Sequence, residues 1–169
     1  DATKIEDAVQ NFVDIYNAFV QLIKDNSDYD LSTKTAELFN GDSAARGIRD
    51  ILSNARSTIP SELSGAPIKT LSALGVTIQQ NGLLSLDSTT LQQAIKTSSS
   101  DVTTAIAAYG KSLSNAVSNM TGPSGLLTSR VSSLNTSVDR YEDNVASLEN
   151  RVALIEKRYR AQFTSLDTL

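Results

Sequence analysis

The sequence predicts a mainly α-helical chain with one small β-hairpin, an α+β chain in which a helical domain precedes a long coiled-coil helix. Apolar residues recur at alternating spacings of four and three over the last third of the chain, and again between Ile5 and Ile23. Between these regions, two short alternating segments flank an Asn-Gly turn. We therefore expect a helical domain over residues 1–122, with a hairpin near residues 76–86, and a coiled-coil helix over residues 123–169.

The composition argues against several classes of function. The chain has 169 residues, a net charge of −4, and neither Cys nor His. Without these side chains it has no disulfide framework, no Cys/His zinc site and no His general base. Nucleic-acid binding needs a clustered basic surface, which an acidic chain does not predict. No apolar run approaches the roughly 18 residues of a spanning helix, so we expect no nucleic-acid partner, no membrane span and no cofactor.

Two helices are predicted before the hairpin. The first covers about 20 residues, and Thr3 with Glu6 forms a capping-box pattern at its start. Polar residues from 25 to 30 end it, and a loop follows to Gly41. Asp42 or Ser43 then caps the second helix, which stops before Pro60. The inward face of that helix is predicted to be Ala45, Ile48, Ile51, Leu52 and Ala55.

The register of the hairpin follows from its apolar residues. A two-residue turn at Asn81 and Gly82 would place the apolar residues of the two strands on opposite faces. A three-residue loop over residues 80–82 places them on one face, which we expect to cover the first helix. This loop needs Gly82 in the left-handed region as a bulge. The predicted pairs are Ile78 with Leu84 and Val76 with Leu86.

Short helices are predicted between the hairpin and the next break in the chain. Asp87 or Ser88 caps the first, and Ser99 or Ser100 caps the second, which is predicted to end near Gly110. A weak helical period continues through residues 113–120. The chain is then interrupted by Gly122, Pro123 and Gly125.

The last segment carries a heptad seam. At about 1.5 Å per residue its six heptads form a rod roughly 60 Å long, which needs another helix beside it. The pattern still runs where the sequence stops, so we expect the native helix to continue. The seam residues are Leu127, Val131, Leu134, Val138, Tyr141, Val145, Leu148, Val152, Ile155, Tyr159, Gln162, Leu166 and Leu169.

The C-terminal half of the seam is the candidate surface for contacts with other subunits or partners. Its last turns are expected to dock onto a neighbouring subunit or another protein, or to pack on a helix of the same chain. Val at a positions and Leu at d positions permit a parallel pair in which Arg151 meets Glu156 of the neighbour. The candidate contact residues are Val145, Leu148, Val152, Ile155, Tyr159, Phe163, Leu166 and Leu169.

An enzyme built on this chain would have to use carboxylates. The candidates are Asp28 with Asp30, or Asp139 with Glu142 and Asp143, which are neighbours on one helix. No Gly-rich loop or partner base accompanies them, so we interpret them as a solvated acidic face and predict that the chain is not an enzyme.

Three stretches resemble the family of flagellar filament-capping proteins, hook-associated protein 2. Residues 37–46, ELFNGDSAAR, are similar to the Gly-Asp-Ser-x-x-Arg helix start of that family. Residues 74–95 resemble its glycine-turn hairpin and the helix that follows. Residues 156–169, EKRYRAQFTSLDTL, resemble its C-terminal signature. In this order and spacing the three stretches cover nearly the whole chain.

The resemblance implies that the chain is the C-terminal part of a leg domain followed by most of a terminal coiled-coil helix, truncated at its C-terminal end. It implies a structural protein that is exported by the flagellar secretion apparatus and forms a ring-like cap at the extracellular tip of the filament. There it would promote insertion of flagellin. The implied partners are flagellin, the hook–filament junction proteins and further copies of the chain. The alternative is a generic coiled-coil adaptor or secretion-system tip protein without a flagellar role.

Overall fold

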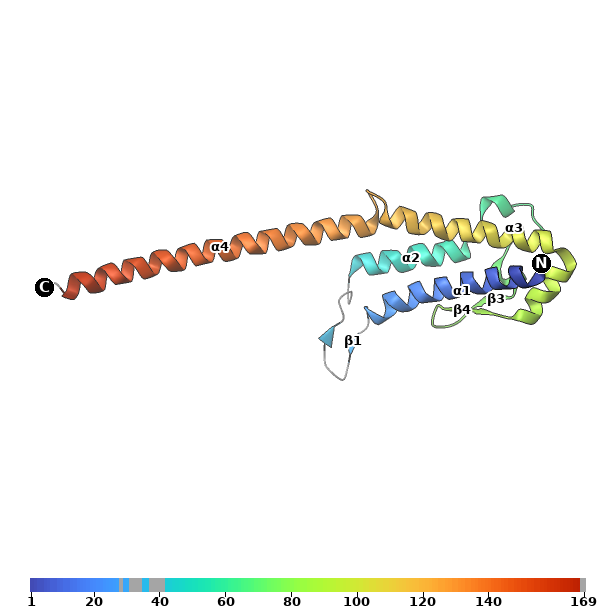
Figure 1. Ribbon diagram of the computed structural model, residues 1–169, viewed down its shortest axis with the longest axis horizontal. Helices are drawn as coiled ribbons and strands as arrows, with labels where there is room; N and C mark the ends of the chain where they lie inside the picture. The colour runs from blue at the N-terminus through green and yellow to red at the C-terminus, as the bar shows by residue number, and fades with distance from the viewer. Residues whose placement is uncertain (28, 31–34, 37–41, 168–169) are drawn as a thin grey trace. The chain divides into compact units, whose positions relative to one another are not determined.

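The computed structural model describes residues 1–27, 29–30, 35–36 and 42–167. They divide into two compact units, unit 1 over Asp1–Leu127 and unit 2 over Thr128–Leu169. The described residues form four α-helices, two short 3-10 helices and two small antiparallel ladders, which confirms the predicted fold class (Figure 1).

The first two helices begin at aspartate caps. Helix α1 (Ala2–Asp25) follows Asp1, whose carboxylate accepts a hydrogen bond from the Thr3 backbone N–H at 3.2 Å. The capping box predicted to start at Thr3 is therefore wrong, since Thr3 is already helical. Helix α2 (Ser43–Ser57) follows Asp42, which accepts from the Ala44 N–H at 2.6 Å. It ends before Pro60 as predicted, whereas the motif residues 37–41 lie outside the described residues.

A minimal ladder lies in the region predicted as a loop. Strand β1 (Tyr29–Asp30) pairs with β2 (Thr35–Ala36) in antiparallel register, with Tyr29 opposite Ala36. Strands of two residues have too few positions to show a period of two, so the pattern could not predict them.

The hairpin has the predicted register. In strands β3 (Val76–Ile78) and β4 (Leu84–Leu86), Ile78 lies opposite Leu84 and Val76 opposite Leu86. Gly82 has φ of 84°, which confirms the left-handed bulge. The expectation of a fully buried apolar face is wrong at Ile78, which is 51% exposed. Ile78 borders an open hollow of about 410 Å³ that Ile59 and Leu71 also line, so its outer side faces solvent.

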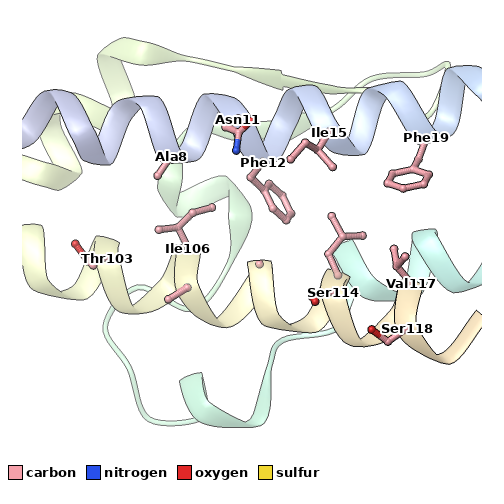
Figure 2. A pocket seen from close by; sticks show the side chains of 13 residues that line it. Ala8, Asn11, Phe12, Ile15, Phe19, Thr103, Ile106, Ser114, Val117 and Ser118 are labelled. Carbon is pink, nitrogen blue, oxygen red and sulfur yellow. The ribbon is translucent and has the colours of Figure 1, made fainter. Parts of the chain in front are cut away.

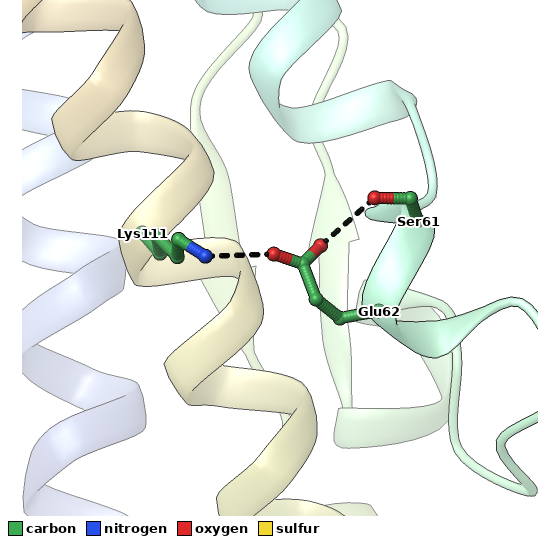
Figure 3. A network of polar contacts seen from close by, with 3 residues as sticks. All are labelled: Ser61, Glu62 and Lys111. Carbon is green, nitrogen blue, oxygen red and sulfur yellow. Dashed lines mark hydrogen bonds and ion pairs between the residues drawn. The ribbon is translucent and has the colours of Figure 1, made fainter.

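Two 3-10 helices, η1 (Ser61–Leu63) and η2 (Leu71–Leu74), occupy the stretch that lacked a clear period. They bury Leu63 and Leu74 completely. The carboxylate of Glu62 accepts hydrogen bonds from Lys111 at 3.0 Å and from Ser61 at 3.2 Å, which links η1 to the third helix (Figure 3). A hydrogen bond within Glu62 itself, followed by those from Lys111 and Ser61, lowers the pKa of this carboxyl.

Helix α3 (Ser88–Thr121) corrects the prediction of short separate helices. The only non-helical residue inside it is Ser98, with φ of −158° and ψ of 93°, so two helical segments join at a kink. The Ser98 hydroxyl accepts from the Asp101 N–H at 3.3 Å and acts as the cap predicted one or two residues later. The second segment does not end near Gly110 but continues to Thr121, because one face of it remains buried along its length. Those buried residues are Val102, Ala105, Ile106, Ala108, Tyr109, Leu113 and Met120.

The core of unit 1 lies between α1, α2 and α3, with the hairpin and the 3-10 helices packed around them; α1 and α3 lie side by side (Figure 1). Its largest fully buried side chains include Tyr16 and Tyr109. The rings of Phe12 and Tyr109 meet edge to face with centroids 6.5 Å apart. The Tyr109 hydroxyl donates to the Lys69 carbonyl at 3.0 Å, which satisfies the one polar group of this large side chain.

Helix α4 (Leu126–Asp167) follows the predicted break, and Gly122 is the C-cap residue of α3. Leu126 and Leu127 pack against the core of unit 1, so the first predicted seam residue belongs to that core. Over Thr128–Asp167 none of the described residues is buried except in part, and the helix runs without interruption.

Candidate contact surfaces

The predicted contact residues of α4 form an exposed apolar stripe. Seven of the eight are described, and each exposes between 43% and 69% of its surface. They recur at intervals of three and four, so they share one face of a helix that turns once every 3.6 residues. The eighth, Leu169, lies outside the described residues. The seven are Val145, Leu148, Val152, Ile155, Tyr159, Phe163 and Leu166.

The stripe has charged flanks of opposite sign. With Val131 at position a of the heptad, the e positions include Glu142, Glu149 and Glu156, and the g positions include Arg151 and Arg158. The Arg160 side chain donates two hydrogen bonds to Oε1 of Glu156, at 2.9 and 2.7 Å. An apolar stripe with charged edges suits a contact with another helix.

The first half of α4 differs in its hydroxyl content. The hydroxyls of Ser133, Thr136 and Ser137 donate to carbonyls four residues earlier, at 2.9 to 3.0 Å. Because these donors are satisfied within the helix, the flanks of the stripe there are neutral and short.

A second apolar surface lies between α1 and α3 and was not predicted. It is a groove of about 600 Å³, and Figure 2 shows Phe12, Ile15 and Phe19 of α1 facing Ile106 and Val117 of α3 across it. None of the described residues that line the groove is charged. Its chemistry therefore suits apolar side chains rather than proton transfer or ion binding.

Small residues on α3 explain the width of this groove. Thr103, Ala107, Gly110, Ser114 and Ser118 line it at helical spacing, and a Cβ built at Gly110 would meet no atom within 4 Å. The signal was present in the sequence, but the predicted end of the helix near Gly110 divided the row into two parts. Only a continuous α3 aligns all five residues on one side.

The candidate carboxylates do not form a recognisable catalytic or metal site. Asp139, Glu142 and Asp143 lie on solvent-exposed turns of α4. Among the described residues, no group of three or more Asp, Glu, His or Cys is arranged to hold a metal ion. Asp28 and the side chain of Asp30 lie outside the described part of the chain.

The helices of the described ranges were also compared with the requirements for crossing a bilayer. None of them combines the necessary length with sufficient apolar character.

Comparison with known proteins gives consistent results. The sequence profile of the family described as Flagellar hook-associated protein 2 C-terminus matches residues 1–169. The flagellar hook-associated protein 2 of Vibrio cholerae is 28% identical over 171 residues, which cover 98% of this chain and 25% of that protein. The lateral flagellar hook-associated protein 2 of Vibrio parahaemolyticus is 29% identical over 174 residues, which cover 100% of this chain and 37% of that protein.

A solved structure shares the fold. The flagellar cap protein FliD from Escherichia coli, represented by its D1-D2-D3 domains, matches with a TM-score of 0.57 and 21% sequence identity. The match covers 74% of this chain and 35% of that one. The chain thus spans well under half the length of the relatives it matches. Because the family profile covers every residue and the three motifs agree with it, this chain belongs to the family of the flagellar hook-associated protein 2 C-terminus.

Proposed function

We propose that this chain is the C-terminal part of a filament-capping protein, in which residues 1–122 belong to a leg domain and residues 123–169 to the terminal helix. In this role the protein forms a ring-like cap at the tip of the flagellar filament, outside the cell, after export by the flagellar secretion apparatus. It promotes insertion of flagellin beneath the cap as a structural protein, not as an enzyme. The family membership supports the flagellar part of this proposal.

The observation that supports a contact role most directly is the exposed stripe on α4. Apolar residues of this size and number, aligned over many turns, are costly to leave in water unless a partner covers them. We propose that flagellin, the hook–filament junction proteins and further copies of the chain are these partners. A cap that stays attached while subunits enter beneath it needs contacts that exchange, and k_off is the rate that most interface changes alter.

The composition of the stripe fits exchange better than permanent association. Tyr141 and Tyr159 stand where a tight coiled coil has aliphatic residues, and Gln162 is polar at a d position. Gln162 would need a hydrogen-bond partner when buried, so it lowers the stability of any complex that lacks one.

The proposal is tested by complementation. The full-length protein that carries this chain is expressed in a strain that lacks its filament-capping protein, and filaments are counted by electron microscopy while lost flagellin is measured in the medium. We expect filaments to be restored. Long filaments are expected to be absent with Leu166→Ser, because Leu166 lies on the stripe.

The matched control is Leu154→Ser. Leu154 and Leu166 are each 66% exposed on the same helix, but Leu154 stands at a c position, away from the seam. If the full-length protein restores no filaments, the proposed function is wrong. If both serine variants are equally defective, the stripe is not the functional surface.

The alternative function, a generic coiled-coil adaptor, would use the same helix without a flagellum. It would leave the cap-deficient strain uncorrected, so the same experiment separates the two.

A further inference from the structure

We propose that two copies of this chain pair in parallel and in register through α4, along the segment from Val131 to Ile155. The inference deepens the proposed function by naming one partner of the contact stripe, and it rests on that function only in treating α4 as a contact surface. The starting observation is that the apolar residues of this segment are all exposed over six consecutive turns, with no described side chain of unit 2 packed over them.

The core positions favour a parallel pair of helices. Four successive a positions carry a β-branched residue, and two of the d positions between them carry Leu. In parallel coiled coils, β-branched residues at a combined with Leu at d favour two strands over three or four. The a residues are Val131, Val138, Val145 and Val152, and the d residues are Leu134, Tyr141, Leu148 and Ile155.

The flanks determine the direction of the second helix. In a parallel pair, the g residue of one helix meets the e residue of the next heptad on the other, so Arg151 meets Glu156 of the second copy. The glutamates at 142 and 149 meet neutral Ser137 and Asn144. In an antiparallel pair the e flanks face each other, which would bring Glu142, Glu149 and Glu156 against the same row. Like charges opposed in this way are unfavourable, so the charge pattern selects the parallel arrangement.

The observed rotamer of Glu156 is compatible with this contact. Both hydrogen bonds from Arg160 go to Oε1, so Oε2 can accept from Arg151 of the second copy. Glu156 then bridges two arginines, one on its own helix and one on the neighbour.

The pairing segment ends where the pattern changes. Tyr159 occupies an a position and Gln162 a d position, and Phe163 places a large ring at e, where the preceding heptads have glutamate. These departures from the dimer pattern leave the last turns of α4 for other partners. The two roles of the stripe therefore fall on successive segments of one helix.

The first experiment measures the mass and the dissociation constant of the 169-residue chain by sedimentation equilibrium over a wide range of concentration. We expect a monomer–dimer equilibrium between 18.1 kDa and twice that mass. Arg151→Glu should raise the dissociation constant about tenfold, since two symmetric attractive pairs become repulsive. The double variant Arg151→Glu/Glu156→Arg should restore most of the affinity. Lys157→Glu makes the same charge change at an f position, outside the interface, and should leave the constant unchanged.

The second experiment determines orientation. The chain has no cysteine, so a single introduced cysteine reports only its own contact. Leu134→Cys and Leu148→Cys should both form intermolecular disulfides under mild oxidation, because every d position meets its own copy in a parallel in-register pair. In an antiparallel pair at most one of the two sites can meet itself.

The inference is overturned by a monomer at all concentrations, by a trimer or larger species, by disulfide formation at only one site, or by equal effects of Arg151→Glu and Lys157→Glu. A dimer that depends on the groove between α1 and α3 would also overturn it, because neither cysteine would then cross-link. These outcomes are independent of filament growth in the complemented strain, so failure of the pairing and failure of the proposed function are distinguished.

Discussion

Asn17 should anchor the hairpin to α1, and replacing it tests how unit 1 is held together. Its side-chain amide donates to the Leu84 carbonyl at 2.8 Å, and its side-chain oxygen accepts from the Leu84 N–H at 2.7 Å. Leu84 lies on the outer edge of a two-stranded ladder, where its backbone groups have no neighbouring strand to pair with. The amide of Asn17 thus takes the place of a third strand at this residue.

The expected loss follows from these two bonds. Each hydrogen bond contributes about 1 kcal/mol net, so Asn17→Ala should lower the free energy of unfolding of unit 1 by about 2 kcal/mol. With an m-value of about 1.5 kcal/mol/M for a domain of this size, the midpoint of urea unfolding should fall by about 1.3 M. Alanine also has the better helix propensity, which offsets several tenths of a kcal/mol.

The control for that offset is Asn11→Ala. Asn11 is an exposed asparagine on the same helix, so its replacement gives the same gain in propensity without the loss of the two bonds. Unfolding is followed in the 169-residue chain by near-ultraviolet circular dichroism, which reports on buried Tyr16 and Tyr109 of unit 1 rather than on α4. Equal midpoints for Asn17→Ala and Asn11→Ala would refute the anchoring role. Full stability of Asn17→Asp, which keeps an acceptor but loses the donor, would show that the bond to the Leu84 carbonyl contributes nothing.

Further predictions concern two glycines and three titrating side chains. Gly82→Val should cost about 2 kcal/mol because φ is 84°, and Gly82→Asn should cost less; equal urea midpoints would contradict the bulge. Gly75→Ala should be more damaging than Gly82→Ala, because its Cβ would also lie 2.5 Å from the Asp87 carbonyl oxygen; calorimetry of the two alanine variants compares them. Burial raises the pKa of Tyr16 and of Tyr109, so their contribution to stability is complete below the ordinary value near 10 and is lost as pH rises through the folded-state values; Tyr16→Phe/Tyr109→Phe should flatten this alkaline decline in urea titrations. A hydrogen bond from the Thr90 hydroxyl, followed by two from backbone N–H groups, lowers the pKa of Asp87, so its contribution is complete above the ordinary value and is lost as pH falls through the folded-state value; Asp87→Asn should remove that part of the acid dependence of the melting temperature.

Periodicity was sufficient for the elements whose apolar residues repeat many times. The rod was predicted because its seam runs without Gly or Pro, and α4 is helical from Leu126 to Asp167. The hairpin register was also predictable, since only one loop length places Val76, Ile78, Leu84 and Leu86 on one face. The aspartate cap of α2 followed from the local chemistry of its side chain.

Local signals were misleading where packing decided the outcome. Gly110 and the Ser/Thr-rich stretch before it predicted separate helices, but burial of one face of α3 outweighs the weak propensity of those residues. Leu127 has the spacing of a seam residue and yet packs against the core of unit 1. A heptad assigns a residue to a helix face, whereas the partner of that face depends on which element lies nearby.

The sequence by itself determined the helical class, the hairpin register, the exposed seam and the family motifs, because each depends on residues close together along the chain. Only the tertiary structure showed the Asn17 anchor, which joins residues 67 positions apart, and the groove between α1 and α3. Neither has a local signal, because an asparagine on a helix and a row of small residues acquire their roles only from the elements that pack against them. Patterns along the chain thus specify which surfaces each element offers, and packing decides which of those surfaces are covered and which remain open to a partner.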